Sequence, residues 1–376
     1  MNHDMWDVWV EVDLAALRHN TVQIRSTVGQ NVKLMAVVKA NGYGHGMIEP
    51  SKAFLATGAN ALAVTRLDEA FQLRQAGIDS PLLVFSPIQP ARARDAVEAD
   101  LELTVDSAVL VQDLSAAAVE AGRQARIHVK VDTGMGRLGL LPKDVPGFFD
   151  AIKSLPGIEV AGIYTHFANA SERDTARTLD QLQVFQNVLG VLDKDSIQYG
   201  DAHAANSAGL LRLPDSHLDM VRPGTLLYGQ YPSAHVPHCL DLKNTWTLKA
   251  RISDLRELPR GTSVGYGSEF VTRRRTLAAV IPVGYADGFG LTPEGPVYRQ
   301  SLVKFAVRKR RRPHVFMKGS TLPVLGRVAM QMCVVDVTDL QGVKIGDEVV
   351  IPARRIPAGT LLRRVYSGTE ATGESL

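Results

Sequence analysis

The stretch KLMAVVKANGYGHG, residues 33–46, has the pattern of a strand that runs into a tight turn. Residues up to Val38 are mostly apolar, and the glycines that follow predict a turn before the next helical stretch. Lys39 stands where the strand ends. Two explanations are open for it: the turn is a phosphate cradle, or the lysine is itself the reactive group.

Neither common nucleotide-binding motif is present in this turn. A dinucleotide fingerprint needs G-x-G-x-x-G between strand and helix, but Met47 occupies the third glycine position. The Gly-Lys-Ser/Thr of a P-loop is also missing. Taken alone, a solvated lysine in a glycine-rich turn explains the stretch equally well, so residues elsewhere must decide.

Apolar strand-like segments alternate with helical segments through residues 33–225. The helical segments, such as RLDEAFQLRQAG, have apolar residues at the 3.6-residue period. The expected strands are KLMAVV, ALAVT, LLVF, LELTV, RIHVKVD, VAGIYTHF, IQYGDAH and LDMVRPG. This order predicts a parallel (β/α)8 barrel in an α/β fold. A doubly wound sheet fits the same alternation, because periodicity does not show closure.

After Tyr228 the pattern changes to short strands separated by glycine and proline turns. We therefore expect a barrel domain at residues 14–228 and a mostly β domain at residues 229–366. The first strand-like segment, residues 1–13, is expected to pack with the β domain. The last segment, residues 367–376, has no apolar period and is expected to be disordered.

Composition restricts the class of protein. The chain has 376 residues, of which 45% are hydrophobic, and a formal net charge of +3. The charge is too small to predict a nucleic-acid partner. No apolar run approaches the ~20 residues of a membrane span. The two cysteines predict neither a disulfide framework nor a zinc site, and we expect a cytoplasmic protein without a metal ion.

Basic and hydrogen-bonding residues follow several of the expected strands. Because active sites of barrels lie at the carboxyl ends of the strands, these side chains should face one cavity. Each has an ordinary structural explanation by itself, but together they favour an anionic ligand. The set comprises Lys39, Lys130, Arg137, His166, His203, Asn206, Ser207 and Arg222.

Pyridoxal phosphate (PLP) has the properties that such a cavity would select. A lysine can form a Schiff base with its aldehyde. Backbone N–H groups near Ser207, Gly224 and Thr225 could hold its phosphate, and an arginine beside the pyridine nitrogen is one of the known ways to tune the ring.

An ordered series of motifs makes the chain resemble the bacterial alanine racemases. The motifs are VVKANGYGHG, KVDTGMGRLG, YTHF, HAANS, VRPGT, VGYGSEF, VGYADGF and GRVAM. They extend over about the first 290 residues and then GRVAM, and the ordered set is specific although each motif alone is weak. The resemblance implies a homodimer whose active sites lie at the subunit interface.

The resemblance also implies a role for each matching residue. Lys39 carries the cofactor and acts as one base, and Tyr266 of the other subunit acts as the opposing base. Tyr43, Asn206, Ser207, Gly224 and Thr225 surround the phosphate. His166 packs near the ring beside Tyr266, and Arg222 faces the pyridine nitrogen. Arg137 and the backbone at Met330 hold the substrate carboxylate, and Tyr285 narrows the entrance. In some relatives the lysine that matches Lys130 is carbamylated and orients the arginine that matches Arg137.

These roles imply PLP-dependent interconversion of L- and D-alanine, with D-alanine supplied for peptidoglycan. Removing a Cα proton from one face and returning one to the other requires two bases that alternate as acids. A cationic network of His166 with Arg222 is expected to favour the phenolate of the tyrosine base. Arg222 is also expected to leave the pyridine nitrogen unprotonated, which should curb transamination.

Three features depart from the family pattern. Gln331 stands where an aspartate is usual, residues 291–319 form a long basic insertion that includes the run at 308–312, and no tyrosine matches the usual C-terminal one. Tyr366 is a poor match for it. The pocket could therefore admit a larger side chain.

Three alternatives remain open. The first is a racemase for serine or a larger amino acid. The second, a non-catalytic PLP-binding barrel, would need neither the β domain nor Tyr266. The third, a PLP decarboxylase, would place a cysteine opposite the ring.

Overall fold

The computed structural model describes residues 6–291, 313–359 and 361–368, and the chain forms two compact units. One unit comprises residues 14–245. The other combines the segment up to residue 13 with the segment from residue 246 onward. Residues 229–245 thus group with the first unit.

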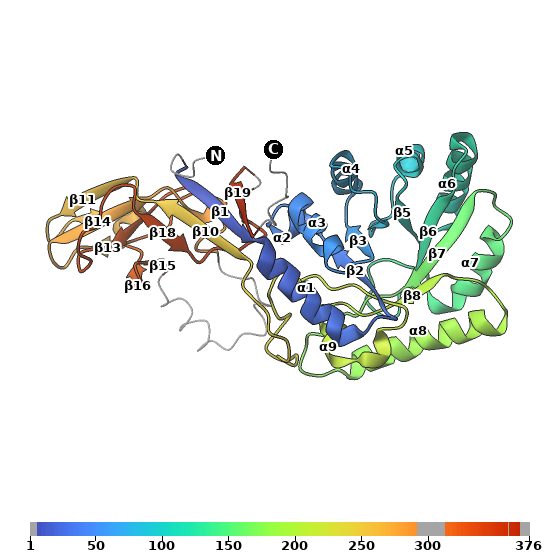
Figure 1. Cartoon of the computed structure of the whole chain (residues 1–376). Helices are drawn as coiled ribbons and strands as arrows, with labels where there is room; N and C mark the ends of the chain where they lie inside the picture. The colour runs from blue at the N-terminus through green and yellow to red at the C-terminus, as the bar shows by residue number, and fades with distance from the viewer. Residues whose placement is uncertain (1–5, 292–312, 360, 369–376) are drawn as a thin grey trace, which may run out of the picture. The chain divides into compact units, whose positions relative to one another are not determined.

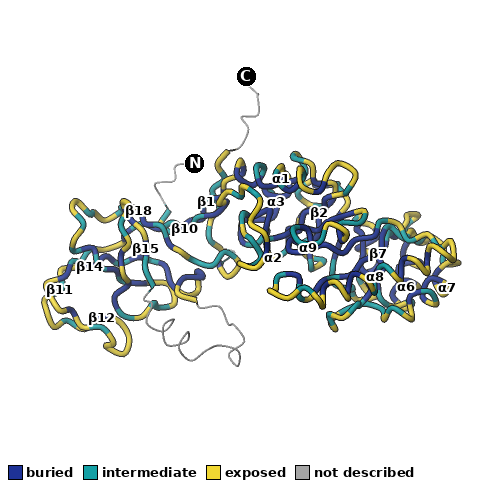
Figure 2. The backbone as a smooth tube through the Cα atoms, turned by 90° about the horizontal axis from the view of Figure 1, so that it is seen from below, coloured by how far each residue is buried: buried dark blue, intermediate teal, exposed yellow. Residues whose placement is uncertain are grey.

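Within the described residues, the first unit contains a sheet of eight parallel strands in the order β8-β7-β6-β5-β4-β3-β2-β9. Both faces of these strands are buried, one against the surrounding helices and the other in the interior of the sheet, which is why most of the strands are apolar runs. β2 is buried along most of its length (Figure 2). The strands are β2 (Lys33–Val37), β3 (Ala61–Val64), β4 (Leu82–Val84), β5 (Glu102–Val105), β6 (Ala125–Lys130), β7 (Ile158–Tyr164), β8 (Asp201–His203) and β9 (Met220–Val221).

The two end strands of this sheet, β8 and β9, approach each other. The amide of Asp219 donates to the carbonyl of Ala202 over 3.1 Å, and the amide of Arg222 donates to that of Ala205 over 2.9 Å. Asn206 and Arg222 form an isolated parallel bridge. The sheet therefore bends into a nearly closed barrel, which confirms the expected barrel and excludes an open doubly wound sheet.

Helices alternate with the strands and lie around them (Figure 1). Local sequence sets their ends: α6 ends at Gly122, whose φ of 61° is left-handed and costs glycine little. The helices are α1 (Leu14–Val28), α3 (Ile48–Ala56), α4 (Leu67–Gln75), α5 (Ala93–Glu98), α6 (Ala108–Ala121), α7 (Val145–Ile152), α8 (Ala176–Lys194) and α9 (Ser207–Arg212).

Buried side chains around the barrel strands differ in character from one part of the sheet to another. On β2, β3, β4 and β9 they form an apolar cluster of Met35, Val37, Ala61, Ala63, Leu83 and Met220. On β5, β6, β7 and β8 many are polar, and this group comprises Glu102, Thr104, His128, Lys130, Tyr164 and His203. Because buried polar groups require partners, the second group must form a hydrogen-bonded network.

The second unit is built mainly from β-strands. Its largest sheet has the order β16-β15-β18-β10-β1-β19, and β11-β14-β17 and β12-β13 form two smaller sheets. The first strand of the chain, β1, pairs antiparallel with β10 and parallel with β19. The strands are β1 (Val8–Asp13), β10 (Trp246–Arg251), β11 (Asp254–Leu258), β12 (Ser263–Val264), β13 (Phe270–Val271), β14 (Thr276–Ile281), β15 (His314–Met317), β16 (Ser320–Pro323), β17 (Cys333–Asp336), β18 (Glu348–Ile351) and β19 (Arg363–Ser367).

Some expectations fall largely outside the described residues. They concern most of the basic insertion at 291–319, including the run at 308–312, and most of the C-terminal tail at 367–376. Among the helices that are described, none combines the length and the hydropathy needed to cross a membrane.

Candidate active site

The segment after β2 is a left-handed turn. Ala40, Asn41, Gly42 and Tyr43 have φ values of 54°, 53°, 61° and 51°. Glycine adopts this conformation readily, whereas each of the other three residues loses roughly 1–2 kcal/mol relative to the right-handed form. A run of this kind persists only where surrounding contacts hold it, and such strain is typical of functional sites.

Several hydrogen bonds hold this left-handed turn in place. The amide of Asn41 donates to Glu69 over 3.3 Å, and its side-chain oxygen accepts from the amide of Met47 over 3.2 Å. The buried ring of His45 contacts the carbonyl of Gly42 at 3.0 Å and the hydroxyl of Thr245 at 2.8 Å. The turn brings Lys39 and Tyr43 to the same cavity.

This cavity has a volume of about 220 Å³ and lies at the carboxyl ends of the barrel strands. Its walls include all eight residues that the sequence assigned to the cofactor. They are Lys39, Tyr43, His166, Asn206, Ser207, Arg222, Gly224 and Thr225. Phe85, Ser171 and Pro232 also line it, and sequence reasoning did not identify them.

Three of the residues assigned to the phosphate converge on one point. The amide of Gly224 donates to the hydroxyl of Ser207 over 2.9 Å. A Cβ atom at Gly224 would lie 2.3 Å from the phenol oxygen of Tyr43, so only glycine allows this approach. Burial raises the pKa of Tyr43 to about 12, which keeps its phenol a hydrogen-bond donor. Hydroxyls beside a backbone cradle suit a phosphate.

We expect Gly224→Ala to weaken PLP binding about 10- to 100-fold, because the new methyl group displaces the phenol of Tyr43. The phenol ring of Tyr43 cannot move away from the new methyl group, because it packs against the ring of Tyr228 with centroids 4.8 Å apart. Titration of apoprotein with PLP measures the effect. The matched control is Gly147→Ala, where a Cβ atom meets nothing within 4 Å. Equal PLP affinity in Gly224→Ala and wild type would contradict the assignment.

Asn206 has a structural task in addition to its place in the wall. Its side-chain oxygen accepts hydrogen bonds of 3.0 Å from the amides of Ala208 and Gly209, and so caps α9. The cap determines where Ser207 begins the helix.

Lys39 lies in a setting that suits a base. Burial, followed by the positive charge of Arg137, lowers the pKa of Lys39, while Glu69 opposes this shift. A lowered pKa increases the fraction of neutral amine at neutral pH, and the neutral amine is the form that reacts with a carbonyl group.

Arg222 is buried and makes only donor contacts. Its guanidinium donates to Nδ1 of His203 over 2.8 Å, to the carbonyl of Thr165 over 2.7 Å and to that of Ala204 over 3.1 Å. Burial lowers the pKa of Arg222 to about 10, so it remains charged at neutral pH.

His166 differs from the expectation that it adds positive charge. Burial, and then the charge of Arg222, lower the pKa of His166 well below its usual value. Its imidazole is therefore neutral near pH 7. Of His166 and Arg222, only Arg222 is a cation.

Lys130 and Arg137 lie near the cavity without lining it. The ammonium of Lys130 donates to the carbonyl of Val131 over 2.9 Å and lies 5.0 Å from the ring centroid of Tyr164. Burial, with the charge of Arg222, lowers the pKa of Lys130 to about 7. Arg137 is exposed, in a loop whose amides at Gly134 and Gly136 donate to the carboxylate of Asp132.

We expect Lys130 to take up CO2 as a carbamate, because roughly half of its amine is neutral at pH 7. The amine nitrogen bonds to the carbon of CO2 and releases a proton. Labelling with ¹³C-bicarbonate should give a carbamate signal that grows as the pH rises from 6 to 8, since the neutral amine grows over this range. Lys130→Arg should remove the signal. A spectrum identical in the variant and in wild type would exclude Lys130 as the site.

Tyr266, Tyr285 and Met330 lie in the second unit, in or beside loops that approach the segment at residues 327–330. The amide of Tyr285 donates to the carbonyl of Ala329 over 3.0 Å, and that of Ala286 donates to Met330 over 2.9 Å. Gly265, next to Tyr266, approaches the same loop at Arg327. These side chains are unusually exposed for apolar or aromatic residues, at 74% for Tyr266, 45% for Tyr285 and 58% for Met330.

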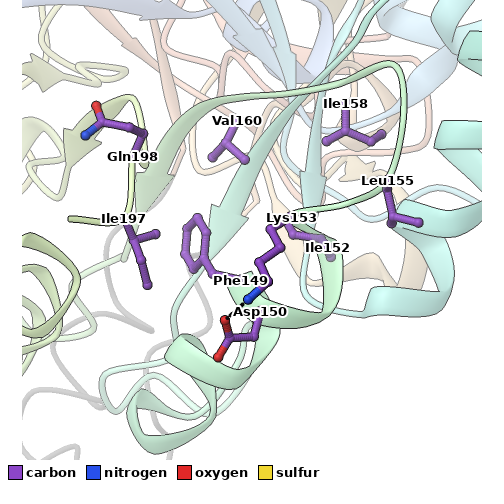
Figure 3. A pocket seen from close by; sticks show the side chains of 9 residues that line it. All are labelled: Phe149, Asp150, Ile152, Lys153, Leu155, Ile158, Val160, Ile197 and Gln198. Carbon is purple, nitrogen blue, oxygen red and sulfur yellow. Dashed lines mark hydrogen bonds and ion pairs between the residues drawn. The ribbon is translucent and has the colours of Figure 1, made fainter. Parts of the chain in front are cut away.

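A separate cavity of about 250 Å³ contains none of the predicted site residues (Figure 3). It is lined mainly by apolar side chains such as Phe149, Ile158 and Val160, and an ion pair of 2.8 Å joins Asp150 to Lys153 beside it. With its one cation already paired, this cavity does not suit an anionic cofactor.

Comparison with known proteins agrees with the geometry. The model of the alanine racemase N-terminal domain matches residues 12–232, and that of the C-terminal domain matches residues 245–365.

Individual proteins give the same result. The chain is 42% identical to an alanine racemase of Desulforamulus reducens, over 92% of this chain and 89% of the relative. It is 40% identical to one of Methanococcus maripaludis, over 92% and 88%. The solved alanine racemase of Clostridium difficile 630 superposes with a TM-score of 0.88 at 30% identity, covering 96% of each chain. The chain therefore belongs to the alanine racemase family, whose members interconvert L- and D-alanine with PLP.

Proposed function

We propose that Lys39 and Tyr266 are the two bases of this racemase and that each active site combines Lys39 of one subunit with Tyr266 of another. The observation that carries the proposal is the cavity at the carboxyl ends of the barrel strands. It joins a lysine of lowered pKa, a buried guanidinium and a hydroxyl-lined backbone cradle.

The residues of this cavity fit PLP. Tyr43, Ser207 and the backbone at Gly224 and Thr225 would hold the phosphate, and Arg222 would face the pyridine nitrogen. When bound, PLP supplies the electron-withdrawing ring that acidifies the Cα–H bond of the amino acid. Arg222 only donates hydrogen bonds, so it would leave the pyridine nitrogen unprotonated.

Proton transfer would take place on two faces of Cα. Nζ of Lys39 accepts the Cα proton on one face, and the phenol of Tyr266 delivers a proton to the other face. The reverse reaction exchanges the two roles, so each group alternates between acid and base. Arg137 and the backbone at Met330 would hold the substrate carboxylate, and Tyr285 would limit access.

A second copy of the chain would cover the exposed side chains of the second unit. Tyr266, Tyr285, Met330 and Met332 form an aromatic and apolar group that is 45% to 74% exposed, and such side chains are enriched at protein interfaces. We further propose a cytoplasmic enzyme whose D-alanine is used for peptidoglycan.

Racemisation assays by circular dichroism test the substrate as well as the reaction. With L-alanine, L-serine and L-lysine as substrates, we expect alanine to have the highest kcat/KM. The second candidate is a racemase for larger amino acids. It is favoured by the position of Tyr366, which pairs with Val12 within a sheet, because the resemblance leaves no other match for the usual C-terminal tyrosine that limits substrate size. Faster turnover of lysine than alanine would favour this candidate, and PLP binding without turnover of any of the three would contradict both.

A further inference from the structure

A chain of buried hydrogen bonds leads away from Arg222 along the polar strands of the barrel. Nη1 of Arg222 contacts Nδ1 of His203 at 2.8 Å. Nε2 of His203 contacts Nδ1 of His128 at 2.9 Å, and Nε2 of His128 contacts the carboxylate of Glu102 at 3.0 Å. Each of the four residues is at most 7% exposed. None of the roles proposed above uses His128 or Glu102.

These contacts admit one arrangement of hydrogens. Guanidinium only donates, so Nδ1 of His203 must accept, and the ring proton of His203 lies on Nε2. That proton can only be donated to Nδ1 of His128, so Nδ1 of His128 is an acceptor. The ring proton of His128 therefore lies on Nε2, which faces Glu102. The reverse direction would point an N–H group of His203 at the N–H groups of Arg222. Both imidazoles are therefore neutral and Glu102 is ionised.

The pKa shifts agree with a neutral His203 and an ionised Glu102. Burial, and then the charge of Arg222, lower the pKa of His203 well below its usual value. Burial alone would raise the pKa of Glu102, but the hydrogen bond from His128 is the main contribution that brings it below its usual value.

The barrel is shaped to let the two histidines meet. His128 is on β6 and His203 is on β8, with β7 between them (Figure 1). The residue of β7 at the crossing is Gly162, where a Cβ atom would lie 2.5 Å from Nδ1 of His128. A side chain here would occupy the position of the hydrogen bond.

The chain of contacts runs between the two ends of the barrel. Glu102 and His128 line a cavity of about 260 Å³ together with Lys33, Ala61 and Asp201, the first residues of β2, β3 and β8. Arg222 lines the cavity at the carboxyl ends. Hydrogen bonds thus connect groups at the amino-terminal end of the strands to Arg222 in the candidate active site.

We propose that Glu102 and His128 are positioning residues that lock His203 in the Nε2–H tautomer and thereby hold Arg222 as an oriented donor toward the cofactor. The proposal rests on the proposed placement of Arg222 at the pyridine ring. Glu102 needs only to present an oxygen that accepts from His128, so an amide oxygen should replace it, whereas an alkyl group should not.

The direct test is the tautomeric state of the histidines in wild-type protein loaded with PLP. Long-range ¹H–¹⁵N spectra of ¹⁵N-histidine-labelled protein distinguish protonated from acceptor ring nitrogens, and His128→Asn and His203→Asn variants assign the signals. We expect acceptor Nδ1 and protonated Nε2 in both rings. A proton on Nδ1 of His203 would overturn the proposal whether or not the protein racemises alanine, so a failure here is distinct from a failure of the proposed function.

Two substitutions at Glu102 add a kinetic test. Glu102→Leu should free the His203 tautomer and lower kcat about tenfold with KM within about twofold, because Arg222 acts on the chemical step. Glu102→Gln should stay within about twofold of wild type on both measures. Arg126 also forms an ion pair of 3.0 Å with Asp100, so neither variant is expected to leave it without a carboxylate partner.

The matched control is Glu159→Gln. Glu159 is an exposed residue that lines the same amino-terminal cavity but does not belong to the chain of contacts. Its substitution should leave the histidine tautomers and kcat unchanged. A folded Glu102→Leu protein with wild-type tautomers and wild-type kcat would contradict the proposal, as would equal losses in the Leu and Gln variants.

Discussion

Lys39→Ala is expected to lower kcat for alanine racemisation by at least about 10³-fold, because it removes one base together with the amine that binds the cofactor covalently. The loss should come from chemistry and not from unfolding. No hydrogen bond or ion pair joins the Lys39 ammonium to another residue in the described part of the chain. The melting temperature of the apoprotein should therefore remain close to that of wild type. Circular dichroism follows racemisation, and the visible band of bound PLP reports the covalent link.

The control for this variant is Lys33→Ala, at the other end of the same strand. Lys33 forms an exposed ion pair of 2.7 Å with Asp201, and pairs of this kind contribute about 1 kcal/mol or less. Its loss should leave kcat unchanged. A Lys39→Ala protein that retained more than about a tenth of wild-type kcat would exclude Lys39 as a base.

The second large effect is a recovery of activity when two inactive variants are mixed. Tyr266→Phe should lower kcat about 10²- to 10⁴-fold by removing the opposing base, with little loss of stability because Tyr266 is 74% exposed. If Lys39 of one subunit works with Tyr266 of the other, a hybrid of Lys39→Ala and Tyr266→Phe subunits contains one intact site. Random reassociation of equal amounts should then restore about a quarter of the wild-type sites.

Mixing Lys39→Ala with the double variant Lys39→Ala/Tyr266→Phe provides the control, because no hybrid then contains an intact lysine. If each site were built from a single chain, neither mixture would recover activity. Native mass spectrometry of the same samples, with one variant labelled with ¹⁵N, confirms that subunits have exchanged. Exchange without recovery in the first mixture would show that the two residues do not meet across an interface.

Much of the site could be predicted from the sequence because its parts are local. Lys39 follows an apolar strand, and Asn206, Ser207 and Gly224 also lie where strands end. Parallel strands carry their carboxyl ends to one edge, so their order along the chain was enough to predict that these residues share a cavity. The structure places these four residues in the wall of one cavity, together with His166 and Arg222. Lys130, Arg137 and His203 were expected to face the same cavity but do not line it.

Other parts of the site depend on contacts that a local pattern does not contain. Glycines at 42 and 44 predicted a turn, but not that Ala40 and Tyr43 would also be left-handed, since Glu69 and His45 hold that conformation from outside it. His166 was expected to add charge and is neutral, because its pKa depends on burial and on Arg222, which is distant in sequence. The sequence did contain a signal for the buried chain of hydrogen bonds, namely that the polar residues Glu102 and His128 occur within strand segments that are otherwise largely apolar.

The sequence alone determined the alternation of strand and helix, the change to a β-rich second unit and the family, because apolar periodicity and ordered motifs are properties of the chain itself. Tertiary structure alone decided that β8 and β9 meet to close the barrel, that Lys130 has a pKa of about 7, and that His128 reaches His203 over Gly162. Closure, desolvation and hydrogen-bond direction arise between residues distant in sequence, and they come into existence only when the chain is folded.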